Sequence, residues 1–145
     1  MAAYLSTELG GSANQTAAPV GLKPAASVYG ARVRRMRATF TLNSQATTDT
    51  LVVGTLPAGS TFAYGVVNAS VTLGASATVA IGSAASTGKY RAAATFTAAA
   101  PTLFGDSAAV AAAPLSAEEQ VIVTIGTAAL PSSGTFTVDL YYSMP

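Results

Sequence analysis

The sequence lacks histidine, cysteine and tryptophan, and only 9% of its 145 residues are charged. Histidine is the usual general base of enzymes and, with cysteine, the usual ligand of transition metals. Their absence excludes Ser-His-Asp and Cys-His catalytic arrangements and also any disulfide framework. A chain without cysteine fits folding in a reducing cytoplasm.

Long apolar runs are missing as well, although half of the residues are hydrophobic. Residues 50–88 carry no charge, but glycine and proline interrupt them repeatedly. A membrane-spanning helix needs about 20 mostly apolar residues without such breaks. The first residues also lack the basic start and apolar core of a secretory signal. We therefore expect that the protein does not associate with a membrane. We also expect that it is made in the cytoplasm of the producing cell.

Strong net charge is absent too, since seven basic and six acidic residues leave a formal charge of +1. This balance argues against nucleic acid or an acidic membrane as partner. Mean hydropathy is nevertheless positive, at +0.46. A chain so poor in charge and so apolar is expected to cover apolar surface against other protein subunits.

The carboxylates are scattered rather than paired. Paired-carboxylate catalysis needs two such groups held a few ångströms apart with different proton affinities. Only Glu118 and Glu119 are neighbours, and on a helical turn they would diverge. No phosphate-binding glycine motif and no calcium loop is present. We expect a non-enzymatic protein without cofactor, metal or small-molecule substrate. The six carboxylates are Glu8, Asp49, Asp106, Glu118, Glu119 and Asp139.

What the sequence does contain is alternation of apolar and polar residues with period two, which indicates β-strands. Small residues dominate and suit closely packed strands and short turns. The pattern predicts an all-β fold, an antiparallel β-sandwich or jelly-roll-like barrel of about seven strands with an extended N-terminal arm. The predicted strands are 36–42, 51–53, 61–73, 78–81, 90–97, 121–125 and 135–142.

Two strands carry finer expectations. In the strand 61–73 the large residues Phe62 and Tyr64 share one parity and the later apolar residues the other, so we expect a β-bulge at Gly65. The strand 90–97 is expected to direct four side chains inward, namely Tyr90, Ala92, Ala94 and Phe96.

One helical turn is predicted at residues 115–119. Ser116 stands three residues before Glu119, which is the spacing of a capping box. The alanine-rich residues 108–113 could precede or extend this turn, but Pro114 prevents one continuous helix.

The N-terminal part differs from the rest. We divide the chain into an extended arm, residues 1–35, and a β-sandwich domain, residues 36–145. The arm has no helix or strand period and cannot bury a core alone. It could be an unstructured tail, but its spaced large residues favour an arm that binds a neighbouring subunit. The anchors that we single out are Tyr4, Leu5, Leu9, Leu22 and Tyr29.

Four of the seven basic residues fall within six positions at the end of the arm. These residues could dock on the acidic face of a partner protein, or they could keep an exposed edge strand soluble. Nucleic acid is the least favoured partner, because interleaved aromatic residues and a basic domain are missing. The four residues are Arg32, Arg34, Arg35 and Arg37.

These segments resemble a known family. The arm ends in Tyr-Gly-Ala-Arg-Val-Arg-Arg (29–35), and the β domain contains Leu-Pro-Ala-Gly-Ser-Thr (56–61), Lys-Tyr-Arg-Ala-Ala-Ala (89–94), Leu-Ser-Ala-Glu-Glu (115–119) and a final Gly-Thr-Phe-Thr-Val-Asp-Leu-Tyr-Tyr (134–142). In style and spacing, without a diagnostic motif, they are similar to the cement or decoration (head auxiliary) proteins of tailed bacteriophages.

The resemblance implies a jelly-roll-like domain, commonly a homotrimer, whose arm clasps the major capsid protein. The protein would then be a virion structural protein on the capsid surface, made in the host cytoplasm, and it would stabilise the assembled head.

Other classes remain open from the sequence. The chain could be the base of a head fibre or spike, a connector or a tail protein of the same particle. It could also be a carbohydrate-binding or receptor-binding β-sandwich module, although such sites usually expose tryptophan, which is missing here.

Overall fold

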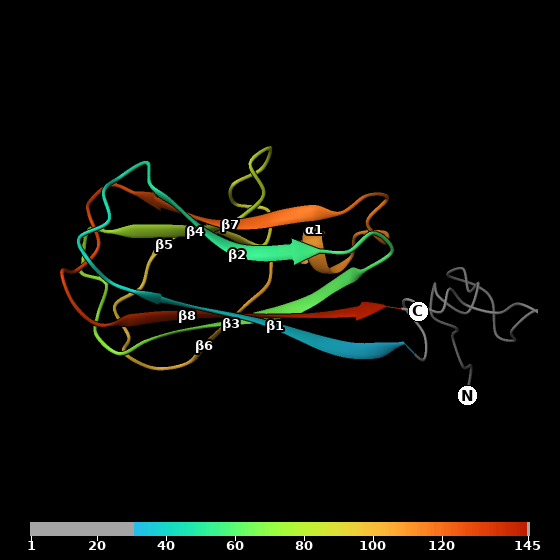
Figure 1. Cartoon of the computed structure of the whole chain (residues 1–145), viewed down its shortest axis with the longest axis horizontal. Coiled ribbons are helices and arrows are strands. Elements are labelled where there is room, and N and C mark those ends of the chain that lie inside the picture. The colour runs from blue at the N-terminus through green and yellow to red at the C-terminus, as the bar shows by residue number, and fades with distance from the viewer. Residues whose placement is uncertain (1–30, 145) are drawn as a thin grey trace, which may run out of the picture.

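The computed structural model describes residues 31–144 of the chain. They form two four-stranded antiparallel sheets packed as a sandwich, which confirms the predicted fold class (Figure 1). The strands are β1 (Arg32–Thr41), β2 (Thr50–Leu56), β3 (Thr61–Ala69), β4 (Thr78–Gly82), β5 (Arg91–Thr95), β6 (Thr102–Phe104), β7 (Glu119–Gly126) and β8 (Thr135–Met144).

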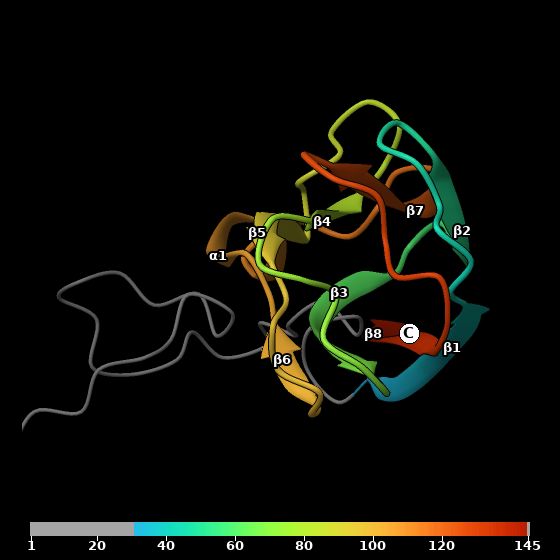
Figure 2. The same ribbon diagram turned by 90° about the vertical axis from the view of Figure 1, so that its left-hand side faces the viewer.

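The strand order is that of a jelly roll. One sheet has the order β1-β8-β3-β6 and the other β2-β7-β4-β5, so consecutive strands mostly lie in different sheets. Figure 2 shows the two layers end-on, with β1 below β2 at one side and β6 below β5 at the other. Eight strands wound in this way form the double Greek key of jelly-roll domains.

The core lies between the sheets and comes from the alternation seen in the sequence. The inward residues of the central strand β8, Phe136, Val138 and Leu140, have no exposed surface. On the edge strand β1 the inward residues Met36 and Phe40 are only partly buried. A strand with a neighbour on both sides therefore buries the same pattern more completely than an edge strand does.

The bulge in β3 is present but lies earlier than predicted. The register against β8 shifts between Phe62 and Tyr64, not at Gly65. Phe62 is buried, whereas Tyr64 is 39% exposed, so the two residues do not share a face. Gly65 instead makes room for Phe104 of β6, because a Cβ at Gly65 would overlap that ring.

Of the four side chains expected to point inward from the strand 90–97, two are buried and two are exposed. Tyr90 and Phe96, just outside the strand, are buried, but Ala92 and Ala94 are exposed. β5 is an edge strand, and its pairing with β4 shifts register between Val79 and Ile81. Alanine gains little from burial, so the two aromatic residues anchor the ends while the middle of the strand stays exposed.

No helical turn forms at residues 115–119, where one was predicted, and the helix lies earlier, at the start of the alanine-rich residues 108–113. The helix α1 is Ser107–Val110, and Asp106 caps it by accepting a hydrogen bond from the Ala108 amide at 2.9 Å. Leu115 instead pairs its backbone with the turn before β3, donating to the Ser60 carbonyl at 2.9 Å. Glu119 begins β7 and makes side-chain contacts elsewhere, so no capping box forms.

The strand missed from the sequence is β6, which has three residues. So short a segment shows no clear alternation. Among the described residues, no helix is long and apolar enough to cross a membrane.

Candidate protein-binding surface

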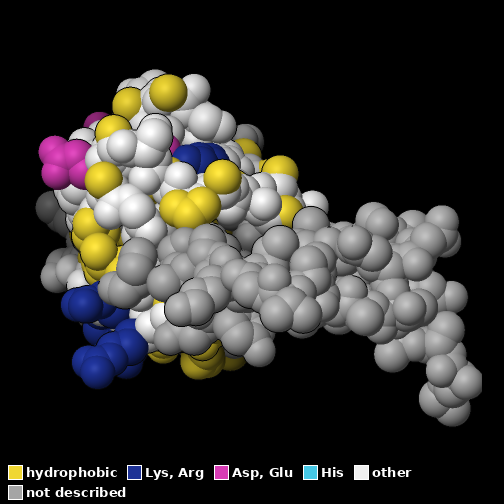
Figure 3. Space-filling model, turned by 90° about the vertical axis from the view of Figure 1, so that its right-hand side faces the viewer, with side chains coloured by type: hydrophobic (Ala, Val, Ile, Leu, Met, Phe, Trp, Pro, Cys, Tyr) yellow, Lys and Arg dark blue, Asp and Glu magenta, His cyan; other side chains and the backbone are white. Residues whose placement is uncertain are grey.

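The four predicted arginines lie on β1, which begins four residues before the expected start of the β domain. Side chains alternate between the two faces of a strand. Arg35 and Arg37 thus lie on the outer face of the sheet, while Arg32 and Arg34 share the parity of the inward Met36. All four are exposed. Figure 3 shows basic side chains gathered at one corner of this end of the molecule.

Arg37 has a structural partner on β8. Its Nε and Nη2 donate to the two carboxylate oxygens of Asp139, each at 2.7 Å. This bidentate geometry is strong because the planar guanidinium matches the carboxylate. The hydrogen bonds lower the pKa of Asp139, against an opposing effect of burial, and Arg35 adds a favourable charge interaction. Arg37 is therefore committed to holding β1 on β8.

The other three arginines are not committed in this way. No carboxylate of the described residues lies within ion-pairing distance of Arg32, Arg34 or Arg35. The described ion pairs are Arg37–Asp139 and Lys89–Glu119. Three exposed guanidinium groups at one end of a weakly charged molecule form a positive surface suited to an acidic partner.

Beside these arginines the outer face of the sheet carries aromatic and aliphatic side chains. Tyr141 is opposite Arg35 on one side and opposite Tyr64 on the other. The two tyrosine rings stack with centroids 4.6 Å apart and planes 17° from parallel. Farther along the face, Val66 pairs with Leu103 of β6, which is 69% exposed. Tyrosine and arginine are the residue types enriched at protein interfaces.

The sequence did not indicate this aromatic part of the surface. The sequence predicts that Tyr64 shares a face with Phe62, and the bulge between the two residues overturns that prediction. Tyr141 and Tyr142 do fall on opposite faces, as period two requires, but the contact of Tyr141 with Tyr64 depends on the neighbouring strand. The remaining predicted site residues lie outside the described part of the chain; they are Tyr4, Leu5, Leu9, Leu22 and Tyr29.

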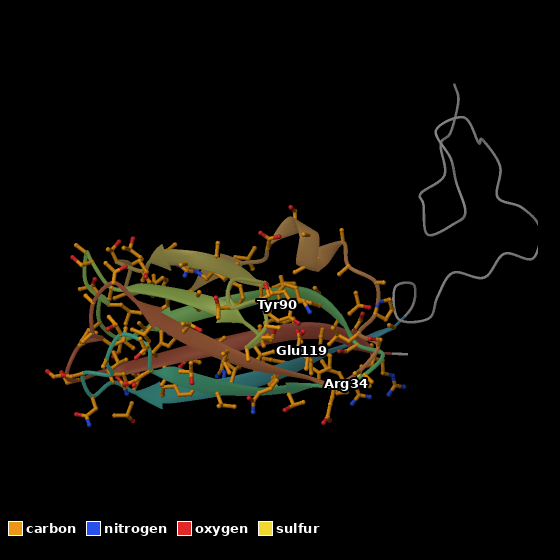
Figure 4. The ribbon with its side chains drawn as sticks, turned by 90° about the horizontal axis from the view of Figure 1, so that it is seen from above. Arg34, Tyr90 and Glu119 are labelled. Carbon is orange, nitrogen blue, oxygen red and sulfur yellow. The ribbon has the colours of Figure 1, made fainter. Side chains whose placement is uncertain are left out.

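A second polar cluster joins the segment before β5 to the start of β7. Lys89 donates to both carboxylate oxygens of Glu119, at 2.8 and 2.7 Å, and the Tyr90 hydroxyl donates to the same carboxylate. Burial, and then the neighbouring Glu119, raise the pKa of Tyr90. In Figure 4, Tyr90 and Glu119 lie close together, whereas Arg34 lies at the end of the sandwich.

Most of the described carboxylates have local structural partners. Asp49 accepts from the Ala46 amide at 2.7 Å, and Asp106 caps α1. Glu119 and Asp139 bind the basic groups named above. Only Glu118 of this set has no such contact. Across the described residues, no group of three or more acidic side chains could hold a metal ion.

A hollow of about 370 Å³ lies between α1 and the segment before β5. Its polar side chains include Lys89, which is bound to Glu119, and Asp106, which caps the helix. Alanines supply much of the remaining lining. Because its charged groups already have partners, this hollow offers less to a ligand than the arginine end of β1.

Comparison with known proteins supports the architecture. No family model and no curated protein matches the sequence. Among solved structures, a chain of the cyanophage Pam1 capsid asymmetric unit superimposes with a TM-score of 0.69 at 18% identity, covering 92% of this chain and 100% of that one.

Two further capsid structures contain similar chains. One is from the capsid of Ralstonia phage GP4, with a TM-score of 0.63, 17% identity and coverage of 79% and 85%. The other is from the acid-stable capsid of Helicobacter pylori bacteriophage KHP30, with a TM-score of 0.58, 12% identity and coverage of 78% and 88%. The chain thus shares its fold with chains found in phage capsids.

Proposed function

We propose that this protein is a capsid cement or decoration protein, which binds the assembled head of a tailed bacteriophage and stabilises it. The main support for this proposal is the structural similarity of nearly the whole chain to a chain of a phage capsid asymmetric unit. The exposed arginine and tyrosine surface gives such a protein a means of attachment. The function is architectural, and the partner is the major capsid protein.

The physical mechanism is mass action. A protein that binds the assembled lattice but not the free subunits stabilises the lattice, and this stabilisation grows with the logarithm of the protein concentration relative to its dissociation constant. Copies related by symmetry present the same surface several times, and their combined attachment is much stronger than that of one copy. We propose a homotrimer in which residues 1–35 form the interaction arm, whose last four residues also pair with β8, and residues 36–145 form the body.

The experiment is a sedimentation assay with capsids of the encoding phage assembled without this protein. Full-length protein should co-sediment with capsids and raise the temperature at which they release DNA or fall apart. A chain lacking residues 1–31 should stay folded and lose binding, because the arginine and tyrosine surface that it keeps is too weak to hold it on the capsid without the arm. If full-length protein fails to bind capsids, the proposed function is wrong; if the truncated chain decorates capsids normally, the role of the arm is wrong.

A further inference from the structure

Each sheet ends in two edge strands, which carry backbone groups without a partner strand. Three of the four described edges are short or interrupted. β6 has only three residues, and β2 shifts register between Val52 and Gly54. β5 has only five residues, and its pairing with β4 is interrupted between Val79 and Ile81, where the Arg91 guanidinium donates to the Val79 carbonyl. These features oppose the addition of another strand.

The remaining edge, β1, is long and regular. It pairs with β8 over ten consecutive residues without a register shift. In an antiparallel pair, every second residue of an edge strand directs its N–H and C=O away from the partner. β1 therefore presents an evenly spaced row of donors and acceptors. In Figure 1 its first half extends past the end of β2, and the side chains of residues 32–35 are all exposed.

The charges on this half select what can pair with it. Arg32 and Arg34 lie on one face of the strand and Arg35 on the other, and no described carboxylate lies within ion-pairing distance of any of them. A second copy of β1 would bring arginine against arginine, which is unfavourable. A strand with acidic residues would instead place carboxylates beside the guanidinium groups on either face.

We propose that residues 32–36 of β1 form a strand-addition site, which binds an extended acidic segment of a partner protein. Backbone hydrogen bonds supply the attachment, and the arginines select the sequence, as in other cases of strand addition to a sheet edge. That the partner is the capsid protein rests on the proposed function; the site itself rests only on the edge and its charges.

The test uses full-length protein and capped ten-residue peptides that alternate glutamate with threonine, valine or tyrosine. Amide hydrogen exchange is measured at single-residue resolution with and without peptide. The expected result is protection of alternate amides within residues 32–36, with no change on β5. Absence of binding, or binding that leaves these amides unprotected, would overturn the proposal. Equal binding of peptides with lysine in place of glutamate would also overturn it.

Substitutions of the arginines test whether their charge, and not the folding of the protein, determines peptide binding. The double variant Arg34→Glu and Arg35→Glu should weaken peptide binding by about tenfold, because two favourable cross-strand pairs become repulsive. The double variant Arg34→Ala and Arg35→Ala provides a second, uncharged test and should weaken it less. The matched control adds two glutamates to the exposed edge of the other sheet, Ala92→Glu and Ala93→Glu, and should leave binding unchanged. Equal binding by the arginine variants and the control would contradict the proposal.

The same exchange measurement on capsid-bound protein distinguishes the two proposals. Binding to capsids with protected β1 amides supports both. Binding to capsids without that protection leaves the decoration function intact and overturns strand addition as its means. Peptide binding with protected amides but no capsid binding supports the site and contradicts the function.

Discussion

At the scale of single residues, Gly65 shows how a neighbouring strand fixes the choice of side chain. The ring of Phe104 occupies the position where a Cβ at Gly65 would lie. Any larger residue must displace that ring from a packed core. Gly65 is thus required by packing, although its position in the sequence indicated a bulge.

We predict that Gly65→Val destabilises the fold by about 1–3 kcal/mol, the usual cost of overpacking. The measurement is the free energy of unfolding in urea. Gly105→Ala is the matched control, because a Cβ there would meet Val110 at an ordinary 3.4 Å. Combining Gly65→Val with Phe104→Ala should recover part of the loss. Equal stability of Gly65→Val and wild type would contradict the packing argument.

The Arg37–Asp139 pair makes stability depend on pH in a defined direction. Hydrogen bonds from Arg37 lower the pKa of Asp139 in the folded protein. A carboxylate with a lowered pKa stabilises the fold above its unfolded pKa, near 4, and this contribution is lost as the pH falls through the folded value.

Asp139→Asn should therefore lower stability at neutral pH and flatten its decline below about pH 4. Urea unfolding at a series of pH values from about 2 to 7 measures both effects. Glu118→Gln is the control, because Glu118 has no hydrogen bond or ion pair with the described residues. If the Asp139 variant declines as steeply as wild type in acid, the pair does not supply this dependence.

At the scale of elements, the side chain of Glu119 connects β7 to the segment just before β5, and these two strands are not neighbours in their sheet. Glu119 begins β7, while Lys89 and Tyr90 precede β5, and β4 lies between those strands. The side chains of Lys89 and Glu119 are only 27% and 21% exposed, so solvent screens their interaction less than at the open surface. The cluster thus fixes one end of the sheet across β4.

Glu119→Gln should lower the free energy of unfolding by about 1–2 kcal/mol, since hydrogen bonds to a charged group exceed neutral ones. Glu118→Gln changes the adjacent exposed residue in the same way and should alter stability by no more than about 0.5 kcal/mol. Thermal and urea unfolding of the two variants give the comparison. Similar stability of both variants would show that the cluster contributes little.

The elements also show where sequence patterns succeed. Long strands such as β8 were predicted because five or more alternating residues define a face. β6 was missed because three residues do not, and the turn at 115–119 was misplaced because Glu119 binds Lys89 and Tyr90 instead of a helix end. Tyr64 was placed on the wrong face because a bulge shifts the parity of every later residue.

At the scale of the whole molecule, assembly is the property to measure. We predict a native mass of three copies of the 14.3 kDa chain for the full-length protein. If the arm exchanges between subunits, removing residues 1–31 should reduce this mass to one copy. Native mass spectrometry measures both. A stable monomer in both cases would contradict the trimer and favour a separate binding module.

The sequence alone determined the β class, the near-complete set of strands and the run of arginines, because each depends on local periodicity or composition. Only the tertiary structure decided that Arg37 is held by Asp139, while no carboxylate of residues 31–144 lies within ion-pairing distance of Arg32, Arg34 or Arg35. It also decided that Tyr64 stacks on Tyr141 beside them. These contacts join residues far apart in the chain, and their partners follow from strand order and register, which local patterns do not encode.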